Sequence, residues 1–214
     1  MCGGAPSSPP GTWRTRRKKA RAFRRLHRLQ KAAREPRADF ELWYADGVHF
    51  NLLPVTRSAW RRKGQRLLVP TPGKNVRVGV VGAIRFPSRH FLFAYQPKSV
   101  TTALFLSLLE KLVARAKRTG RRIVLVLDNG GPFTSHRAQA ALEAARPQVR
   151  VLRLPSYTSE TLNWIEGYWD ELKSTYFSQM LTEQREAFYP EAVRLLHRLR
   201  RSGRLSLLAP RATP

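Results

Sequence analysis

The chain has 214 residues, enough for one domain of ordinary size with an appendage, and its hydrophobic content of 42% supports a proper core. A formal net charge of +26, from 40 Lys and Arg against 14 Asp and Glu, predicts an anionic partner. Nucleic acid fits better than a membrane surface, because the basic residues are spread along the whole chain. The single cysteine, Cys2, excludes a disulfide framework or thiolate cluster, and no apolar run approaches the roughly 18 residues of a membrane span. We therefore expect a soluble protein of the reducing cytoplasm.

Residues 1–37 are expected to form a disordered leader followed by a basic helix. Glycine and proline dominate the first ten residues, which is typical of a leader without regular structure. Between Arg14 and Arg37 the chain is densely basic, and Phe23, Leu26 and Leu29 recur at helical spacing. This pattern predicts a cationic helix with a thin apolar stripe, either solvated or in contact with a DNA backbone.

Strands are expected to follow. Residues 39–45 are apolar and aromatic enough for a strand that ends at Asp46 and Gly47, and residues 48–54 either continue it or begin a turn. A basic loop, Trp60 to Lys63, combines stacking and phosphate-binding groups. Residues 75–84 and 89–95 then resemble a hairpin closed through Pro87.

The second half of the chain alternates between helix and strand. We expect helices at 101–119 (capped by Thr101 or Thr102 and ended by Gly120), 138–145, 160–177 and 184–201, and strands at 123–127 and 149–154. Strands followed by helix–strand repeats predict an α/β fold with a mixed sheet flanked by helices. This order suits the ribonuclease-H-like fold, in which Asp46 and Asp128 would end neighbouring central strands.

Three acids have settings that suggest chemistry. Asp128 follows five apolar residues, although the Asp-Asn-Gly-Gly sequence that it begins also favours a simple turn. Asp46 ends an apolar run in the same way, and Glu166 lies among apolar and aromatic residues on a predicted helix. Asp170, one turn after Glu166, is its rival, because residues four apart share a helix face. Phosphodiester cleavage and joining use two Mg²⁺ ions held mainly by carboxylates, so these acids are candidate ligands.

Other features have plainer readings. His49 is interpreted as a polar strand-end residue, and Trp164, Tyr168 and Trp169 as packing residues. The predicted helix at 184–201 carries a cationic face that could run along a DNA backbone.

The sequence resembles a known family. Asp128-Asn129, followed by Leu154-Pro155-x-Tyr157 and Leu162-Asn163-x-Ile165-Glu166-x2-Trp169-x3-Lys173, is similar to the catalytic core of insertion sequence 630 transposases, which are bacterial relatives of mariner elements. The resemblance covers about residues 38–177. It implies domain limits of 38–180 for a ribonuclease-H-like DDE catalytic domain and 181–214 for a C-terminal basic helix and tail.

The same resemblance implies a function. Asp46, Asp128 and Glu166 would be the catalytic and metal-binding triad, holding two Mg²⁺ or Mn²⁺ ions. The activity would be DNA strand cleavage and strand transfer at inverted-repeat transposon ends and target DNA, by a possible homodimer associated with the bacterial nucleoid. DNA contacts are expected from the following residues: Trp60, Arg61, Arg62, Lys63 and Lys173.

The chain departs from the family pattern at several positions. Gly47 stands where members usually have Glu, Trp164 replaces a proline, and Phe133 replaces a histidine, with His136 three positions further on. The N-terminal helix-turn-helix region of full-length members is not found in this sequence. Two other functions therefore stay open: a truncated, inactive remnant that only binds nucleic acid, and a host nuclease or resolvase of the same fold.

Overall fold

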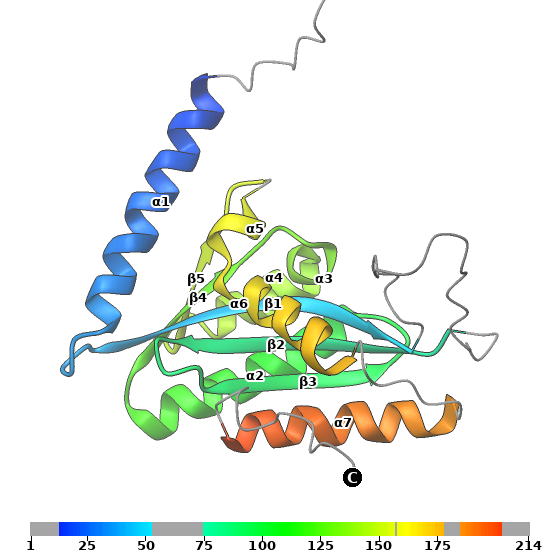
Figure 1. Ribbon diagram of the computed structural model, residues 1–214. Coiled ribbons are helices and arrows are strands. Elements are labelled where there is room, and N and C mark those ends of the chain that lie inside the picture. The colour runs from blue at the N-terminus through cyan, green and yellow to red at the C-terminus, as the bar shows by residue number, and fades with distance from the viewer. Residues whose placement is uncertain (1–12, 53–74, 157, 178–184, 203–214) are drawn as a thin grey trace, which may run out of the picture.

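A computed structural model describes residues 13–52, 75–156, 158–177 and 185–202. A five-stranded sheet with the order β3-β2-β1-β4-β5 forms the centre of the molecule, and helices cover both of its faces (Figure 1). β1 pairs antiparallel with β2 and parallel with β4, so the sheet is mixed, as predicted. The strands are β1 (Phe40–Asn51), β2 (Arg77–Phe86), β3 (Phe91–Pro97), β4 (Arg122–Leu127) and β5 (Val149–Arg153).

The helices alternate with the strands in the second half of the chain. They are α1 (Trp13–Ala33), α2 (Thr102–Thr119), α3 (Gly131–Thr134), α4 (His136–Ala144), α5 (Ser159–Leu162), α6 (Trp164–Leu172), the π-helix η1 (Lys173–Phe177) and α7 (Arg185–Ser202). None of these described helices is long and apolar enough to cross a membrane.

Local sequence signals explain where the elements begin and end. The hydroxyl of Thr101 accepts a hydrogen bond from Leu104 N and caps α2, and Gly120 ends that helix with a left-handed φ of 65°. Ser135 caps α4 by accepting a hydrogen bond from Ala138 N. The β2–β3 hairpin turns through the cis Phe86–Pro87 bond, close to its predicted position.

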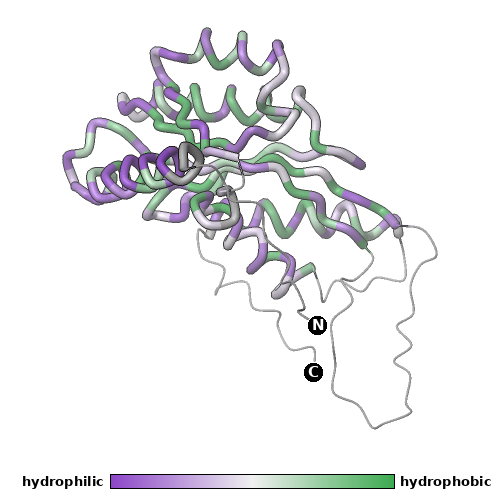
Figure 2. Tube along the Cα trace, turned by 90° about the horizontal axis from the view of Figure 1, so that it is seen from above, coloured by the Kyte–Doolittle hydropathy of each residue, from purple (hydrophilic) through white to green (hydrophobic). Residues whose placement is uncertain are grey.

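Side chains of β1 alternate between two cores. Leu42 and Tyr44 point to one face of the sheet and pack with residues of α6, η1 and α7, while Trp43 and Ala45 point to the other face and pack with residues of α2 and α4. Hydrophobic residues accordingly run along the strands, while hydrophilic ones lie on the outer sides of the helices (Figure 2). The sheet is therefore buried on both faces.

The structure decides one open alternative and corrects one expectation. The strand expected at 39–45 continues beyond Asp46 and Gly47 to Asn51, because these residues remain paired with β2 as far as Arg77. The helix expected at 160–177 is divided, since Asn163 separates α5 from α6 and the last turn is a π-helix. The predicted basic loop from Trp60 to Lys63 lies outside the described residues.

Candidate active site

Parallel pairing of β1 and β4 brings two of the three acids together. The register pairs Tyr44 with Val126, and two further residues along each chain lead to Asp46 and Asp128. β4 ends at Leu127, so Asp128 lies at the carboxyl end of a strand whose neighbour carries Asp46. The prediction that the two acids lie on adjacent strands is confirmed, although only Asp128 follows a strand end.

The loop after β4 is held in place by β5 and the residue after it. Arg153 donates from Nη1 to the carbonyl oxygen of Asp128 at 2.9 Å and from Nη2 to that of Phe133 at 2.6 Å. Asn129 donates from Nδ2 to Leu154 O at 2.8 Å. The carboxylate of Asp128 itself accepts a hydrogen bond from Gly130 N at 3.0 Å, the turn geometry that its sequence favours. Asp128 can thus be both a turn residue and a candidate metal ligand.

Asn163 connects the third acid to β1. Its buried side chain donates from Nδ2 to Ala45 O at 3.4 Å, and its own carbonyl accepts a hydrogen bond from Glu166 N at 3.0 Å. The break between α5 and α6 is therefore the point at which the helix carrying Glu166 is attached beside Asp46.

Trp169 closes the site on the α6 side. It is 2% exposed and meets the rings of Phe50 and Phe91 edge-on. Gly82 of β2, which pairs with Asp46, makes room for it, because a Cβ at position 82 would lie 2.4 Å from Cη2 of Trp169. A glycine on the strand next to Asp46 thus allows α6 to approach the sheet closely.

Electrostatics show that the three carboxylates interact. The pKa of Asp46 is raised from 3.8 to about 7, chiefly by burial and also by the charges of Glu166 and Asp128, while hydrogen bonding from Gly47 and Trp169 opposes the shift. The Trp169 contribution is weak, because its buried Nε1–H has no hydrogen-bond partner of standard geometry among the described residues. Ionisation of Asp46 beside the other two acids is therefore unfavourable.

This donor set suits hard divalent cations. Among the described residues, no three His, Cys, Asp or Glu side chains lie close enough together to hold one ion jointly. Magnesium commonly takes only one or two carboxylates and completes its octahedron with water and substrate phosphates. Asp46 interacts with Asp128 and with Glu166, so each pair supplies the one or two carboxylates that a magnesium ion needs. The remaining ligand positions are left for water and substrate phosphate.

Several other sequence candidates lie apart from this site. Asp170 is exposed and is not among the groups that shift the pKa of Asp46. His49 accepts a hydrogen bond from Val100 N at 3.2 Å, on the opposite face of β1. Lys173 is half-buried at the start of η1, and its charge helps to lower the pKa of His49, after the larger effects of burial and Arg77.

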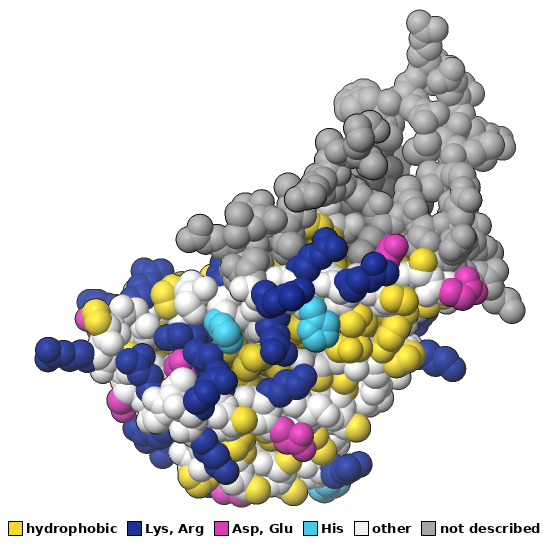
Figure 3. All heavy atoms as spheres, turned by 90° about the horizontal axis from the view of Figure 1, so that it is seen from below, with side chains coloured by type: hydrophobic (Ala, Val, Ile, Leu, Met, Phe, Trp, Pro, Cys, Tyr) yellow, Lys and Arg dark blue, Asp and Glu magenta, His cyan; other side chains and the backbone are white. Residues whose placement is uncertain are grey.

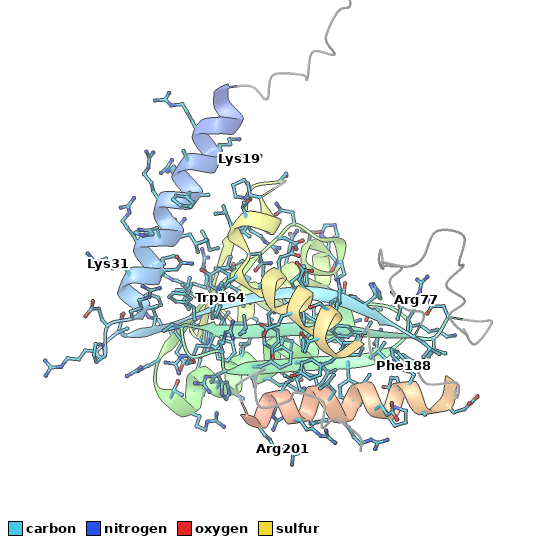
Figure 4. All side chains as sticks on the ribbon, viewed as in Figure 1. Lys19, Lys31, Arg77, Trp164, Phe188 and Arg201 are labelled. Carbon is cyan, nitrogen blue, oxygen red and sulfur yellow. The ribbon has the colours of Figure 1, made fainter. Side chains whose placement is uncertain are left out.

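The aromatic residues of α6 pack as predicted. Tyr168 and Trp169 are buried, and Trp164 lies edge-on to Tyr44 and Phe86 at ring-centroid distances of 6.1 and 5.1 Å. Trp164 lies at the start of α6, on the side of the domain where α1 lies (Figure 4). Packing of its ring accommodates this departure from the family pattern.

The departures at Gly47 and Phe133 lie outside the carboxylate cluster. A Cβ at position 47 would lie 2.9 Å from Cγ1 of Val100, on the face of β1 opposite to Asp46. An acid there would therefore not point toward the other carboxylates. Phe133 is buried and packs edge-on against Phe105, as a core residue.

Two residues of the site, Arg153 and Asn163, were not singled out from the sequence. In the sequence, Arg153 resembles any basic residue at a strand end. Only the fold shows that its guanidinium group donates to the carbonyl oxygens of Asp128 and Phe133. Asn163 was noted within a motif, and its contact with Ala45 spans 118 positions. Neither contact leaves a local signal in the sequence.

A mixed sheet in this order, with helices on both faces and acids on its two central strands, defines the ribonuclease-H-like class. The model of the DDE superfamily endonuclease family matches residues 41–188, and the chain belongs to this family of enzymes. The resemblance to insertion sequence 630 transposases is confirmed. The chain is 32% identical over 147 residues to an uncharacterized 39 kDa protein of insertion element IS630 from Shigella sonnei, covering 69% of this chain and 42% of that protein.

Solved structures of the Mos1 mariner transposase share the fold. The Mos1 paired-end complex with Mn superposes with a TM-score of 0.62 at 11% identity, covering 92% of this chain and 59% of that one. The isolated Mos1 catalytic domain gives a TM-score of 0.55 at 11% identity, covering 91% and 85%. The chain thus spans less than half of its insertion-element relative but most of a mariner catalytic domain.

Proposed function

We propose that this chain is the catalytic domain of a transposase that cleaves DNA at transposon ends and transfers the cut strands, using two Mg²⁺ or Mn²⁺ ions. The observation that carries the proposal is the meeting of Asp46, Asp128 and Glu166 at the β1–β4 edge, where burial first, and the charges of Glu166 and Asp128 in addition, raise the pKa of Asp46. Burial and mutual repulsion both disfavour ionised carboxylates at this place. A bound cation would offset both effects.

Each residue then has a defined task. Asp46, which interacts electrostatically with both of the other acids, would be the shared ligand, and Asp128 and Glu166 would complete the metal positions. The ions, when bound, activate the attacking oxygen and stabilise the leaving oxygen of the phosphodiester. Arg153 and Asn163 hold the backbone beside Asp128 and Asp46, which keeps the carboxylates in place before a substrate arrives.

DNA is the proposed partner. The formal charge of +26 is balanced only by a polyanion, and Lys and Arg far outnumber acids on the face seen from below, where α7 lies (Figure 3). Related structures include Mos1 complexes with transposon ends. Since strand transfer joins the 3′-hydroxyl of each of the two transposon ends to a target strand, we propose that the chain acts as a homodimer on inverted-repeat ends and target DNA.

The decisive experiment compares two substitutions that remove the same charge. Asp128→Asn should abolish Mn²⁺-dependent nicking and joining of end DNA by a protein that still folds and binds DNA. Asp170→Asn, on the exposed side of α6, should retain activity. If Asp128→Asn cuts as well as the parent chain, the assignment is wrong.

A binding measurement separates an enzyme from a remnant that only binds nucleic acid. Titration of the parent chain with Mn²⁺ should show saturable binding that Asp46→Asn and Glu166→Gln weaken. A chain that binds DNA strongly but neither binds Mn²⁺ nor cuts would be the remnant.

A further inference from the structure

A groove lined by arginines lies outside the carboxylate cluster, between α1, α4 and the edge strand β5. Its volume of about 610 Å³ is in the range of ligand-binding clefts. Four arginines from three separate elements line it: Arg25 of α1, Arg146 after α4, and Arg150 and Arg153 of β5. One acid, Glu143, faces them. We propose that this groove binds the phosphate backbone of duplex DNA on its way to or from the carboxylates, as a site distinct from them.

The position of the groove next to the Asp128 loop supports a DNA path between the groove and the carboxylates. Arg153 lines the groove and donates hydrogen bonds to the carbonyls of Asp128 and Phe133. Arg146 and Arg150, which also line it, are exposed. The groove therefore borders the loop that carries Asp128.

The helix α1, which contributes Arg25 to the groove, is strongly cationic. The α1 sequence contains Lys and Arg at many positions and no acid. Leu26 is buried in the core and Gln30 donates to the Tyr44 hydroxyl at 2.8 Å, so the C-terminal half of α1 is fixed to the domain. The N-terminal half, which carries Lys19, extends beyond the sheet (Figure 4). A helix without acids, held along one side of a groove, is suited to follow phosphates.

The chemistry of the edge favours a polyanion over an added β-strand. β5 is short and lies at the end of the sheet, where an extra strand could pair. Cationic side chains at Arg150 and Arg153 oppose such pairing. The ion pair between Arg146 Nη1 and Glu143 Oε1, at 2.6 Å, joins two exposed side chains, and exposed pairs contribute little stability, so a phosphate can replace the carboxylate.

The first test uses a matched pair of double variants in EDTA, where no cleavage occurs and the outcome is independent of the proposed function. Arg146→Gln/Arg150→Gln removes two exposed charges from the groove. Lys117→Gln/Arg118→Gln removes two exposed charges from the last turn of α2. With a duplex of about 30 base pairs, the groove variant should reduce the slope of log affinity against log salt by about 2, and the control variant by much less. Equal losses would show only an effect of net charge and would overturn the proposal.

Two further variants give results in other directions. Arg146→Lys/Arg150→Lys keeps both charges and should keep the salt slope; its loss would mean that phosphate charge is not what the groove recognises. Glu143→Gln should tighten DNA binding several-fold more than Glu110→Gln, an equal charge change on exposed α2. Equal DNA affinities of the two Glu variants would contradict the proposal. Self-association of the chain through β5 that blocks DNA binding would contradict it as well.

Discussion

The Nδ2 group of Asn163 donates a hydrogen bond to the carbonyl oxygen of Ala45 across 118 positions of the chain. Ala45 immediately precedes Asp46, and the carbonyl of Asn163 accepts from Glu166 N. Asn163 therefore links the third acid to the first, through its side chain on one side and its backbone carbonyl on the other. Its Oδ1 is buried without a partner among the described residues, so the amide is retained at a cost in solvation.

Loss of this contact should weaken metal binding more than folding. Asn163→Ala should raise the Mn²⁺ concentration for half-maximal activity by roughly 10- to 100-fold, the usual effect of removing a group that orients metal ligands. Asn163→Asp should do the same, because a carboxylate cannot donate to Ala45 O. The control is Gln139→Ala, which removes a surface hydrogen bond to Thr134 O and should leave the Mn²⁺ dependence unchanged. A purely structural role would lower the melting temperature without moving that dependence.

Arg153 is expected to be a positioning residue for Asp128. Lysine cannot reach both carbonyls with one ammonium group, so Arg153→Lys should lose at least one of the two hydrogen bonds. We expect a tenfold or greater rise in the Mn²⁺ requirement, measured by single-turnover cleavage. Arg150→Lys, at an exposed residue three positions earlier on the same edge strand, should be neutral in this assay. Similar behaviour of the two variants would remove Arg153 from this role.

A methyl group at position 82 should disturb the site through Trp169. Gly82→Ala places a Cβ 2.4 Å from Cη2 of Trp169 and 2.8 Å from Cε2 of Phe91, and overpacking of this kind costs about 1–3 kcal/mol. Displacement of Trp169 moves α6, so cleavage should fall further than stability explains. Gly79 lies on the same strand as Gly82, and a Cβ there would clash with the backbone of Ser99. Gly79→Ala should therefore lower stability without the additional loss of cleavage. Rates compared at a temperature where both variants are folded decide the point.

The pH dependence of the metal-free protein should report the carboxylate cluster. The pKa of Asp46 is raised from 3.8 to about 7, so the folded state holds a proton that the unfolded state releases. The stability linked to this group is fully present below pH 3.8 and is lost as the pH rises through about 7. Asp46→Asn should flatten this decline in the denaturant midpoint between about pH 5 and pH 8, whereas Asp170→Asn should leave it. An unchanged decline in Asp46→Asn would mean that another group is responsible.

A buried ion pair far from the site should matter for folding alone. Glu41 is 3% exposed and receives two hydrogen bonds from Arg115, at 2.6 and 2.8 Å, and one from Trp43. Burial alone would raise the pKa of Glu41, but Arg115 and Trp43 together lower it below 4.5. Glu41→Ala should destabilise by about 3–5 kcal/mol, because it leaves a buried guanidinium unpaired.

The control for this pair is exposed. Asp39→Asn breaks the surface pair with Arg122 and should change the free energy of unfolding by less than about 1 kcal/mol. In urea melts, the contribution of Glu41 should be present above pH 4.5 and disappear as the pH falls through its lowered pKa. Equal effects of the two substitutions would contradict the role of burial.

Much of the architecture was predictable because its signals are local. The apolar run before Asp128, the cap at Thr101 and the stop at Gly120 are written in neighbouring residues, and each matches the structure. The boundaries that local signals left open or misplaced depend on distant partners. β1 passes Asp46 because β2 continues to pair with it, and the helix of Glu166 breaks at Asn163, where its side chain binds β1.

The sequence by itself determined the α/β order and the motif that marks the DDE superfamily endonuclease family, and its charge predicts a polyanionic partner. Only the tertiary structure decided which acids share one site. Asp46 and Asp128 become neighbours through the register of two parallel strands, and Asp170 is excluded because it lies on the exposed side of α6. The raised pKa of Asp46, the fork of Arg153 and the arginine groove along β5 likewise require segments far apart in the chain to meet. Composition and hydrophobic periodicity are properties of neighbouring residues and can be seen in the sequence. The burial of Asp46 and its repulsion by the other acids arise only after the chain has folded.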